Sequence, residues 1–156
     1  MHETPDFPST PPTGTSARPP IRLERTGERS FTATLRDGRT LPVGPDRASG
    51  AFSPGELLQI ALAGCHAMSA DARVMHALGE QGEPEWWLRA CYARDEDAYT
   101  AFDVVCEADM SHLSDEEVAK TTQRVGAAIE RSCTIGHTLK TNPTTTVRIG
   151  GRLVEE

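Results

Sequence analysis

The sequence predicts an α+β protein with the element order βββ-α-ββ-α-(α)-β. Three observations lead to this class. Short runs that favour strands are separated by turn residues, two segments begin with a helix-capping serine, and the first of these continues for more than twenty residues without a further proline. A chain of 156 residues has the size of one domain and can bury a core of its own.

The N-terminal part divides into a tail and three strands. Residues 1–20 are rich in proline, serine and threonine, which predicts a disordered tail, and residues 21–156 form the predicted domain. Residues 21–25, 30–35 and 40–43 favour strands, with turns at residues 26–29 and 36–39. Because Asp37–Gly38 between two such runs is typical of a hairpin, we expect a three-stranded antiparallel meander.

The first helix begins with a capping box. Ser53 is the expected N-cap, Pro54 takes the first helical position, and Glu56 stands three residues after the cap. The pattern continues to Leu78, and Gly79 ends it. Apolar and small residues cover more than one face, so we expect this helix at the centre of the domain or in an oligomer interface.

The second half repeats the change from strands to helix. Residues 86–93 and 100–108 predict a hairpin, in which Cys91 and Cys106 are expected to be small buried hydrophobes. A second capping box, at residues 114–117, begins a helix with one apolar stripe. Extending this stripe by one turn predicts that Cys133 points inward. Residues 144–149 predict a last strand. The stripe consists of Val118, Thr122, Val125 and Ile129.

The charge balance limits the partners. The chain has 16 Lys and Arg against 23 Asp and Glu, a net charge of −7, which argues against nucleic-acid binding through phosphates. No apolar run approaches the roughly 18 residues of a transmembrane helix, and residues 1–6 lack the features of a signal peptide. We therefore expect a cytoplasmic protein with no membrane partner, whose cysteines are free, metal-bound or redox-active rather than structural disulfides.

The four cysteines favour a thiol pair over a metal site. They stand at positions 65, 91, 106 and 133, without the closely spaced ligand pairs of structural zinc sites, so we expect no metal and no cofactor. Cys65 and Cys133 stand in the contexts most suited to chemistry. Neither cysteine lies clearly at a helix N-terminus, so activation would have to come from a guanidinium. The candidates are Arg29, Arg36, Arg39 and Arg47.

Two segments resemble the OsmC/Ohr family of thiol-dependent peroxidases. Residues 53–65 are similar to the family's helix motif PEELL…AALAGC, and residues 132–143 to its second cysteine segment. The resemblance covers the element order from about residue 21 to residue 154. It implies an intertwined homodimer, with long central helices packed on antiparallel sheets and active sites at the interface.

The resemblance also implies roles for particular residues. Cys65 would be the peroxidatic thiolate, oxidised to a sulfenic acid, and Cys133 the resolving thiol that captures it as a disulfide. A dithiol reductant, a lipoyl protein or a thioredoxin-like protein, would then restore the thiols. The implied activity is the reduction of organic hydroperoxides, and less well of hydrogen peroxide, in oxidative-stress defence. Arg29 is the nearest match to the family's activating arginine and Arg39 the second, and the other interpretation of Arg29 is a solvated turn cation.

The sequence departs from the family pattern at two positions. The family's arginine-orienting glutamate, ten residues before the first cysteine, is replaced by Gly55, and the proline after the second cysteine by Thr134. Glu56 would replace that glutamate only with a shifted helix start, and its capping role is favoured. A ligand-binding protein of the same fold, with little or no peroxidase activity, is therefore the alternative. A Cys/His metal site is a third hypothesis. For His66 and His137, beside the two thiols, structural roles are favoured over proton transfer.

Overall fold

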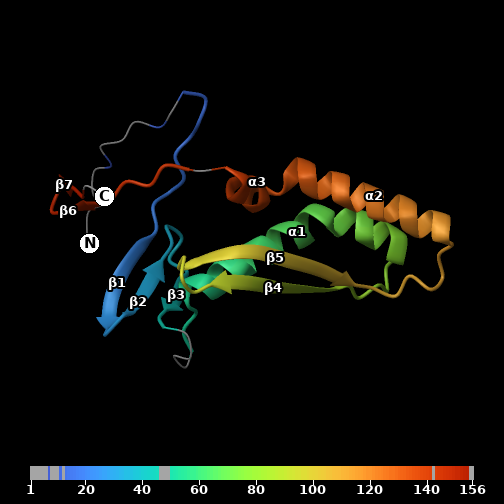
Figure 1. The fold of residues 1–156 in the computed structure, drawn as a ribbon, viewed down its shortest axis with the longest axis horizontal. Helices are drawn as coiled ribbons and strands as arrows, with labels where there is room; N and C mark the ends of the chain where they lie inside the picture. The colour runs from blue at the N-terminus through green and yellow to red at the C-terminus, as the bar shows by residue number, and fades with distance from the viewer. Residues whose placement is uncertain (1–6, 8–10, 12, 46–49, 142, 155–156) are drawn as a thin grey trace. The chain divides into compact units, whose positions relative to one another are not determined.

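The computed structural model describes residues 7, 11, 13–45, 50–141 and 143–154 (Figure 1). The chain forms two compact units, residues 1–57 and residues 58–156, which are described separately below. The predicted tail, residues 1–20, lies in part outside the described residues, and so does Arg47. Over the described part of the chain, no helix combines the length and apolar character needed to cross a bilayer.

The first unit contains the predicted meander. Strands β1 (Arg22–Gly27), β2 (Ser30–Thr34) and β3 (Thr40–Val43) pair antiparallel in the order β1-β2-β3. Ala33 on the central strand faces Leu23 on one side and Leu41 on the other, and it is buried. Gly38 adopts a left-handed φ of 86° in the turn before β3, which explains the glycine at this position. The predicted three-stranded meander is confirmed.

Arg29 lies in the tight turn between β1 and β2. Its φ of 51° is left-handed, an unusual conformation for a residue with a side chain. The register of the two strands shifts between Arg25 and Gly27, directly before this turn. The turn therefore fixes the direction in which the Arg29 side chain leaves the sheet.

Helix α1 (Pro54–Leu78) begins in the first unit and continues through the second. Its capping box is complete. The Ser53 hydroxyl accepts from the Glu56 backbone N–H at 3.2 Å, and the Glu56 carboxylate accepts from the Ser53 backbone N–H at 2.7 Å. Ser53 is only 3% exposed. The helix ends at Gly79, whose φ is 78° and whose N–H donates to the Met75 carbonyl. Both predicted ends are confirmed.

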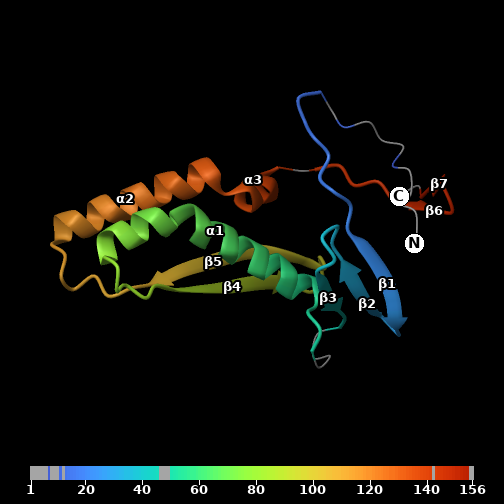
Figure 2. The ribbon, with the colours of Figure 1, turned by 180° about the vertical axis from the view of Figure 1, so that it is seen from behind.

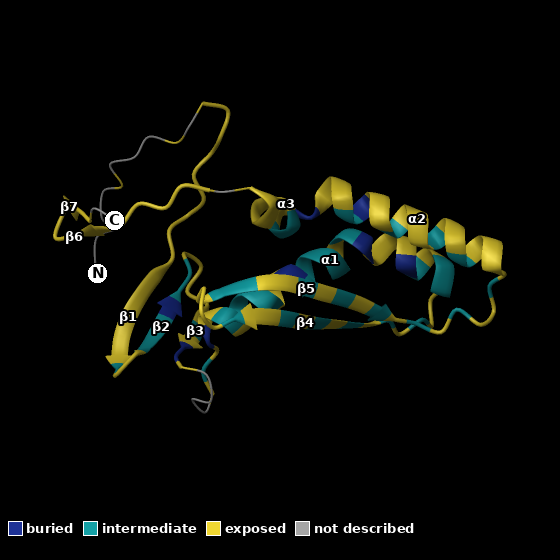
Figure 3. Cartoon of the chain, viewed as in Figure 1, coloured by how far each residue is buried: buried dark blue, intermediate teal, exposed yellow. Residues whose placement is uncertain are grey.

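The second unit contains a long hairpin of β4 (Glu85–Ala93) and β5 (Ala98–Glu107). Burial alternates along both strands, so Leu88 and Phe102 are half-buried on one face while Arg89 and Asp103 form an ion pair on the exposed face (Figure 3). Cys106 is half-buried, as expected. Cys91 is exposed, so its predicted burial is wrong, because the strand's alternation turns this position outward.

Helix α2 (Asp115–Ser132) carries the second predicted capping box, between Ser114 and Glu117, and is followed by the short helix α3 (Thr134–Lys140). The predicted stripe is mostly right, but Thr122 is exposed and its hydroxyl donates to the Val118 carbonyl. Thr121 is half-buried in place of Thr122. The face of α2 that turns inward carries Thr121 together with Val125 and Ala128.

Helices and hairpin of the second unit enclose its core. In both views α2 lies along α1, with the β4–β5 hairpin on the opposite side of α1 (Figures 1 and 2). Leu62, Ala70 and Val74 are buried along α1, and Ala128 is buried on α2. The His112 ring bonds to the Ala77 carbonyl at 3.1 Å, which ties the loop before α2 to the end of α1.

The C-terminal strand is shorter than predicted. Within residues 144–149, only β6 (Arg148–Ile149) is a strand, and it pairs with β7 (Arg152–Leu153). Gly150 and Gly151, with φ of 56° and 79°, reverse the chain between them. The chain reverses at these two glycines after only two strand residues, so the last element is a short hairpin and not the single longer strand that was predicted.

Candidate functional site

The two cysteines singled out in the sequence meet in the second unit. Cys65 lies in the interior of α1, and Cys133 lies between α2 and α3. A side-chain hydrogen bond joins the two thiols. All four cysteines of the chain are described, and all are free thiols. The two side chains therefore lie close together, and both sulfurs are reduced.

Cys133 is held by the ends of two helices. Its backbone N–H donates to the Ile129 carbonyl and so ends α2, and its sulfur accepts a hydrogen bond from the Gly136 N–H at 3.2 Å and so caps α3. The residue is 1% exposed. The predicted inward direction of this thiol and its place at the end of the second helix are confirmed.

Backbone N–H groups lower the pKa of the Cys65 thiol. Partial burial raises the pKa of its thiol, but donors from the first turn of α3 and from Cys133 outweigh this, and the pKa lies below the ordinary thiol value. The largest of these backbone effects on the pKa of Cys65 comes from Ile135, followed by Thr134 and by Gly136, whose N–H hydrogen-bonds to the neighbouring Cys133 sulfur. The expectation that neither cysteine meets a helix N-terminus was wrong, because α3 begins directly after Cys133 and contributes its free N–H groups to Cys65.

The two thiols ionise in a defined order. Burial raises the pKa of the Cys133 thiol, and its hydrogen bond to Cys65 raises it further. A proton on Cys133 stabilises a thiolate on Cys65, and the reverse arrangement is less favourable. The lowered pKa of Cys65 and the raised pKa of Cys133 make Cys65 the thiol that loses its proton more readily.

Two histidines lie beside the thiols. The Nδ1 atom of His66 is 3.0 Å from the Leu62 carbonyl oxygen and 3.6 Å from the Cys133 sulfur. His137 bonds through Nε2 to the Glu130 carbonyl, one turn of α3 beyond Cys133. Both histidines and Cys133 border a small hollow of about 230 Å³ between α1, β5, α2 and α3, whose walls also include Phe102 and Val104.

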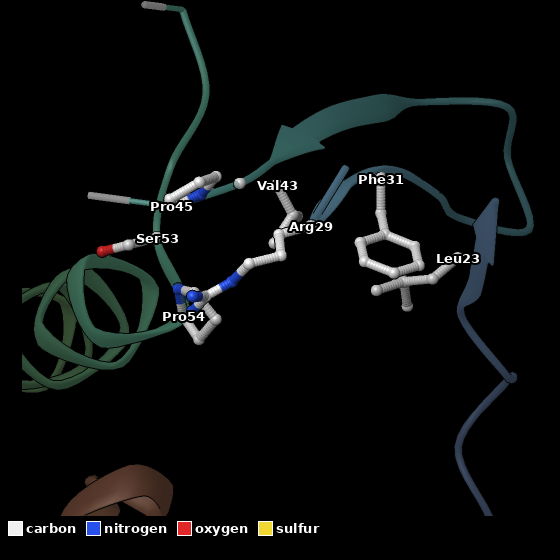
Figure 4. Close-up of a pocket in the computed structure, with 8 residues that line it drawn as sticks. Leu23, Arg29, Phe31, Val43, Pro45, Ser53 and Pro54 are labelled. Atoms are coloured by element: carbon white, nitrogen blue, oxygen red, sulfur yellow. The ribbon is translucent and has the colours of Figure 1, made fainter. Parts of the chain in front are cut away.

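The predicted arginines and Glu56 belong to the first unit. Arg29 lines a hollow of about 780 Å³, and its side chain extends toward Pro54 past apolar walls that include Phe31 and Val43 (Figure 4). Arg39 is exposed and bonds to Asp37 at 2.8 Å, so this cation is already engaged. Glu56 is occupied in the capping box, as its favoured interpretation predicted.

Acidic, histidine and cysteine side chains do not gather into a metal-binding group anywhere in residues 7, 11, 13–45, 50–141 and 143–154.

Comparison with known proteins identifies relatives and the fold. The uncharacterized protein Rv2923c of Mycobacterium tuberculosis is 32% identical over 127 residues, which cover 81% of this chain and 93% of the relative. An OsmC-like protein from Mycoplasma pneumoniae superposes with a TM-score of 0.60 at 15% identity, over 81% of this chain and 89% of that one. The organic hydroperoxide resistance protein OhrB of Bacillus subtilis gives a TM-score of 0.50 at 18% identity, over 79% and 92%. No protein-family model matches the chain.

The meander, the long helix with its cysteine and the second cysteine before a short helix give the chain the fold of the OsmC-like and Ohr proteins, as the sequence resemblance predicted. Within this class, the chain belongs to the same family as the mycobacterial protein Rv2923c.

Proposed function

We propose that the protein is a cytoplasmic thiol-dependent peroxidase that reduces organic hydroperoxides, and less well hydrogen peroxide, through Cys65 and Cys133. The observation that carries this proposal is the contact between the two thiols, in which the pKa of Cys65 is lowered and that of Cys133 is raised. The similar Bacillus subtilis protein is an organic hydroperoxide resistance protein, which agrees with this substrate class. We also propose that residues 21–156 form the functional domain.

The first step is nucleophilic attack by Cys65. Its thiolate attacks the terminal oxygen of the hydroperoxide, a sulfur–oxygen bond forms, and the oxygen–oxygen bond breaks. The leaving alkoxide takes up a proton to become an alcohol, and Cys65 becomes a sulfenic acid, oxidised by two electrons. The backbone N–H groups of α3 lower the pKa of Cys65, so a larger fraction of this cysteine is in the reactive thiolate form.

The second step forms a disulfide. The Cys133 sulfur attacks the sulfur of the Cys65 sulfenic acid, the sulfur–oxygen bond breaks, and hydroxide leaves with the Cys133 proton as water. A dithiol such as a lipoyl group or a thioredoxin-like protein then reduces the disulfide in two thiol exchanges and is itself oxidised to a disulfide. Cys65 is the accessible sulfur for this exchange, because Cys133 is 1% exposed.

We assign secondary roles to two residues of the first unit. Arg29 is proposed as the activating cation, because it extends from a constrained turn into an apolar hollow, where its charge is not neutralised by a described ion pair. Glu56 is proposed to act on the site only through its capping of α1, since its carboxylate bonds to the Ser53 backbone N–H.

A homodimer is part of the proposal. Along one flank of α1, Ile60 is 53% exposed and Met68 is 83% exposed, although both are large and apolar. Gly64 lies between them, and an added Cβ there would meet no atom within 4 Å. A second copy of the helix could approach closely at this flank, and its burial would favour association.

The alternative function is ligand binding without turnover. Two observations favour it: Gly55 stands where the family has a glutamate, and the hollow around Arg29 combines a cation with apolar walls. Native mass spectrometry of the purified protein tests this alternative. A stoichiometric small molecule together with negligible peroxide consumption would support it over the peroxidase.

The peroxidase is tested on the fully reduced protein. Cumene hydroperoxide, tert-butyl hydroperoxide and hydrogen peroxide are added separately, and peptide mass spectrometry without reductant follows the cysteines. We expect a Cys65–Cys133 disulfide, formed faster with the two organic compounds, and no peroxide consumption by Cys65→Ser. Cys91→Ser is the matched control, since Cys91 is exposed and pairs with Ala101 in the β4–β5 hairpin, outside the thiol pair. Reduced cysteines under excess organic hydroperoxide would contradict the proposal.

A further inference from the structure

One ring N–H of His66 lies between two acceptors. Its Nδ1 atom is 3.0 Å from the Leu62 carbonyl oxygen and 3.6 Å from the Cys133 sulfur. A carbonyl oxygen can only accept a hydrogen bond, so the bond to Leu62 places a hydrogen on Nδ1. The same hydrogen is therefore available to the sulfur of Cys133, whatever the protonation of Nε2.

The sulfur of Cys133 consequently has two N–H donors. Gly136 donates from the backbone at 3.2 Å, and His66 donates from its ring. Both donors favour a negative charge on sulfur over a neutral thiol, whereas the burial of Cys133 opposes that charge. Cys133 becomes the attacking thiolate only after Cys65 has been oxidised to a sulfenic acid. The thiolate charge of Cys65 is then gone, and the two N–H donors stabilise the charge that forms on the Cys133 sulfur.

We propose that His66 is a positioning residue for the resolving step, in which its Nδ1–H stabilises the Cys133 thiolate that attacks the Cys65 sulfenic acid. The inference rests on the proposed peroxidase function. The atoms balance as in that reaction: the sulfur–sulfur bond forms, the sulfur–oxygen bond breaks, and the proton of Cys133 leaves with the hydroxide as water. His66 donates a hydrogen bond throughout and neither gains nor loses an electron.

The surroundings of Cys133 make His66 the side chain able to supply this donor. The hollow beside Cys133 receives only apolar side chains, Phe102 and Val104, from β5. The titratable groups around it are Cys65 and His66 on α1, Glu130 on α2, and His137 and Lys140 on α3. The last three bond to one another, through the Lys140 ammonium at 2.9 Å from the Glu130 carboxylate and the His137 ring at the Glu130 carbonyl.

Two substitutions separate the donor from the bulk of the ring. In His66→Asn, the side-chain amide carries an N–H close to the position of Nδ1. In His66→Gln, the amide N–H lies farther out, near the position of Nε2. Both replacements are polar and of similar size, so a difference between them reports the position of the donor and not the loss of the imidazole.

The kinetic test uses one equivalent of cumene hydroperoxide on the reduced protein. Dimedone traps the Cys65 sulfenic acid, and quenched samples give the rate of disulfide formation by mass spectrometry. We expect His66→Gln to slow disulfide formation about tenfold and to accumulate sulfenic acid, while peroxide consumption in the first turnover changes less than about twofold. His66→Asn should resolve within about threefold of the original protein. Resolution of His66→Gln at the original rate, or equal slowing in both variants, would overturn the inference.

A second measurement needs no peroxide. In the Cys65→Ser background, thiolate absorbance at 240 nm against pH, minus that of the Cys65→Ser, Cys133→Ser protein, gives the pKa of Cys133. Adding His66→Gln should raise this pKa by about one unit, equivalent to the tenfold effect, and adding His66→Asn should leave it unchanged. If peroxide fails to oxidise the original protein but the pKa still rises, the proposed function fails and the His66–Cys133 bond stands. An unchanged pKa in His66→Gln overturns the inference itself.

Discussion

The backbone N–H of Gly136 donates to the sulfur of Cys133 at 3.2 Å, and a Cβ built on Gly136 would lie 3.1 Å from the same sulfur. The glycine thus permits the contact by its lack of a side chain. A methyl group at this distance is closer to the sulfur than ordinary packing allows, so the sulfur would have to move. Position 136 is therefore coupled to the geometry of the thiol pair.

Gly136→Ala should slow disulfide formation between Cys65 and Cys133 because the added methyl displaces the Cys133 sulfur. The matched control is Gly126→Ala in α2, where a Cβ meets nothing within 4 Å. The control should gain about 0.5–1 kcal/mol of stability from helix propensity, and Gly136→Ala should gain none of it. Urea unfolding and quenched-flow oxidation measure the two effects. An equal gain in both variants, with unchanged oxidation, would contradict the expected crowding.

The elements that follow from short-range rules could be predicted from the sequence. The serine and glutamate of each capping box lie three residues apart, so their reciprocal bonds depend on one helical turn and not on the rest of the fold. The Asp37–Gly38 turn is local in the same way. The inward direction of Cys133 also followed, because three of the four residues of its helical stripe are at least half-buried.

The features that depend on packing could not be predicted in the same way. Nothing in the residues around Cys65 indicates that Thr134–Gly136 will donate to its sulfur, since the contact joins segments far apart in the chain. The exposure of Thr122 depends on which side of α2 meets α1. An apolar stripe in the sequence does not fix the rotation of the helix about its axis closely enough to choose between Thr121 and Thr122. The resemblance supplied the pairing of the cysteines, and the structure added the donors around them.

Alkylation should distinguish the two thiols. Because the pKa of Cys65 is lowered and that of Cys133 raised, Cys65 should react first with iodoacetamide at pH 7, and peptide mass spectrometry gives the rate at each site. Cys133→Ala removes a donor to the Cys65 thiolate, so the pKa of Cys65 should rise and its alkylation at pH 7 should slow by roughly threefold to tenfold. Exposed Cys91 is the internal standard, and its rate should stay constant. Faster labelling of Cys133 than of Cys65 would show that the order of ionisation is wrong.

Substitution of Glu56 should separate capping from catalysis. Glu56→Gln keeps an oxygen that accepts from the Ser53 N–H, so stability and peroxide consumption should both remain close to the original. Glu56→Ala loses that acceptor and should destabilise the protein by about 1 kcal/mol. Thermal unfolding and a peroxide-consumption assay report the two properties. A stable Glu56→Gln protein without activity would instead assign the carboxylate charge to the reaction.

The capping box of α2 should weaken in acid. Hydrogen bonds from the Ser114 backbone and side chain lower the pKa of Glu117, so the folded state favours the carboxylate. Its contribution to stability is complete above the ordinary glutamate pKa of about 4.3 and is lost as the pH falls through the lower pKa of the folded state. Glu117→Gln should remove this part of the pH dependence. Urea midpoints between pH 7 and pH 3 test it, and parallel curves for the two proteins would exclude the contribution.

The exposed flank of α1 should control association. Met68 is 83% exposed, and a charge at this position would be buried in the proposed dimer without a partner, which is strongly unfavourable. Met68→Glu should therefore shift the protein from dimer to monomer in size-exclusion chromatography with light scattering at a protein concentration of about 10–50 μM, where a Kd above this range gives mostly monomer. Ala119→Glu adds the same charge to an exposed position of α2 and should leave the dimer intact. A monomeric original protein, or a dimer that Met68→Glu leaves unchanged, would show that this flank is not the interface.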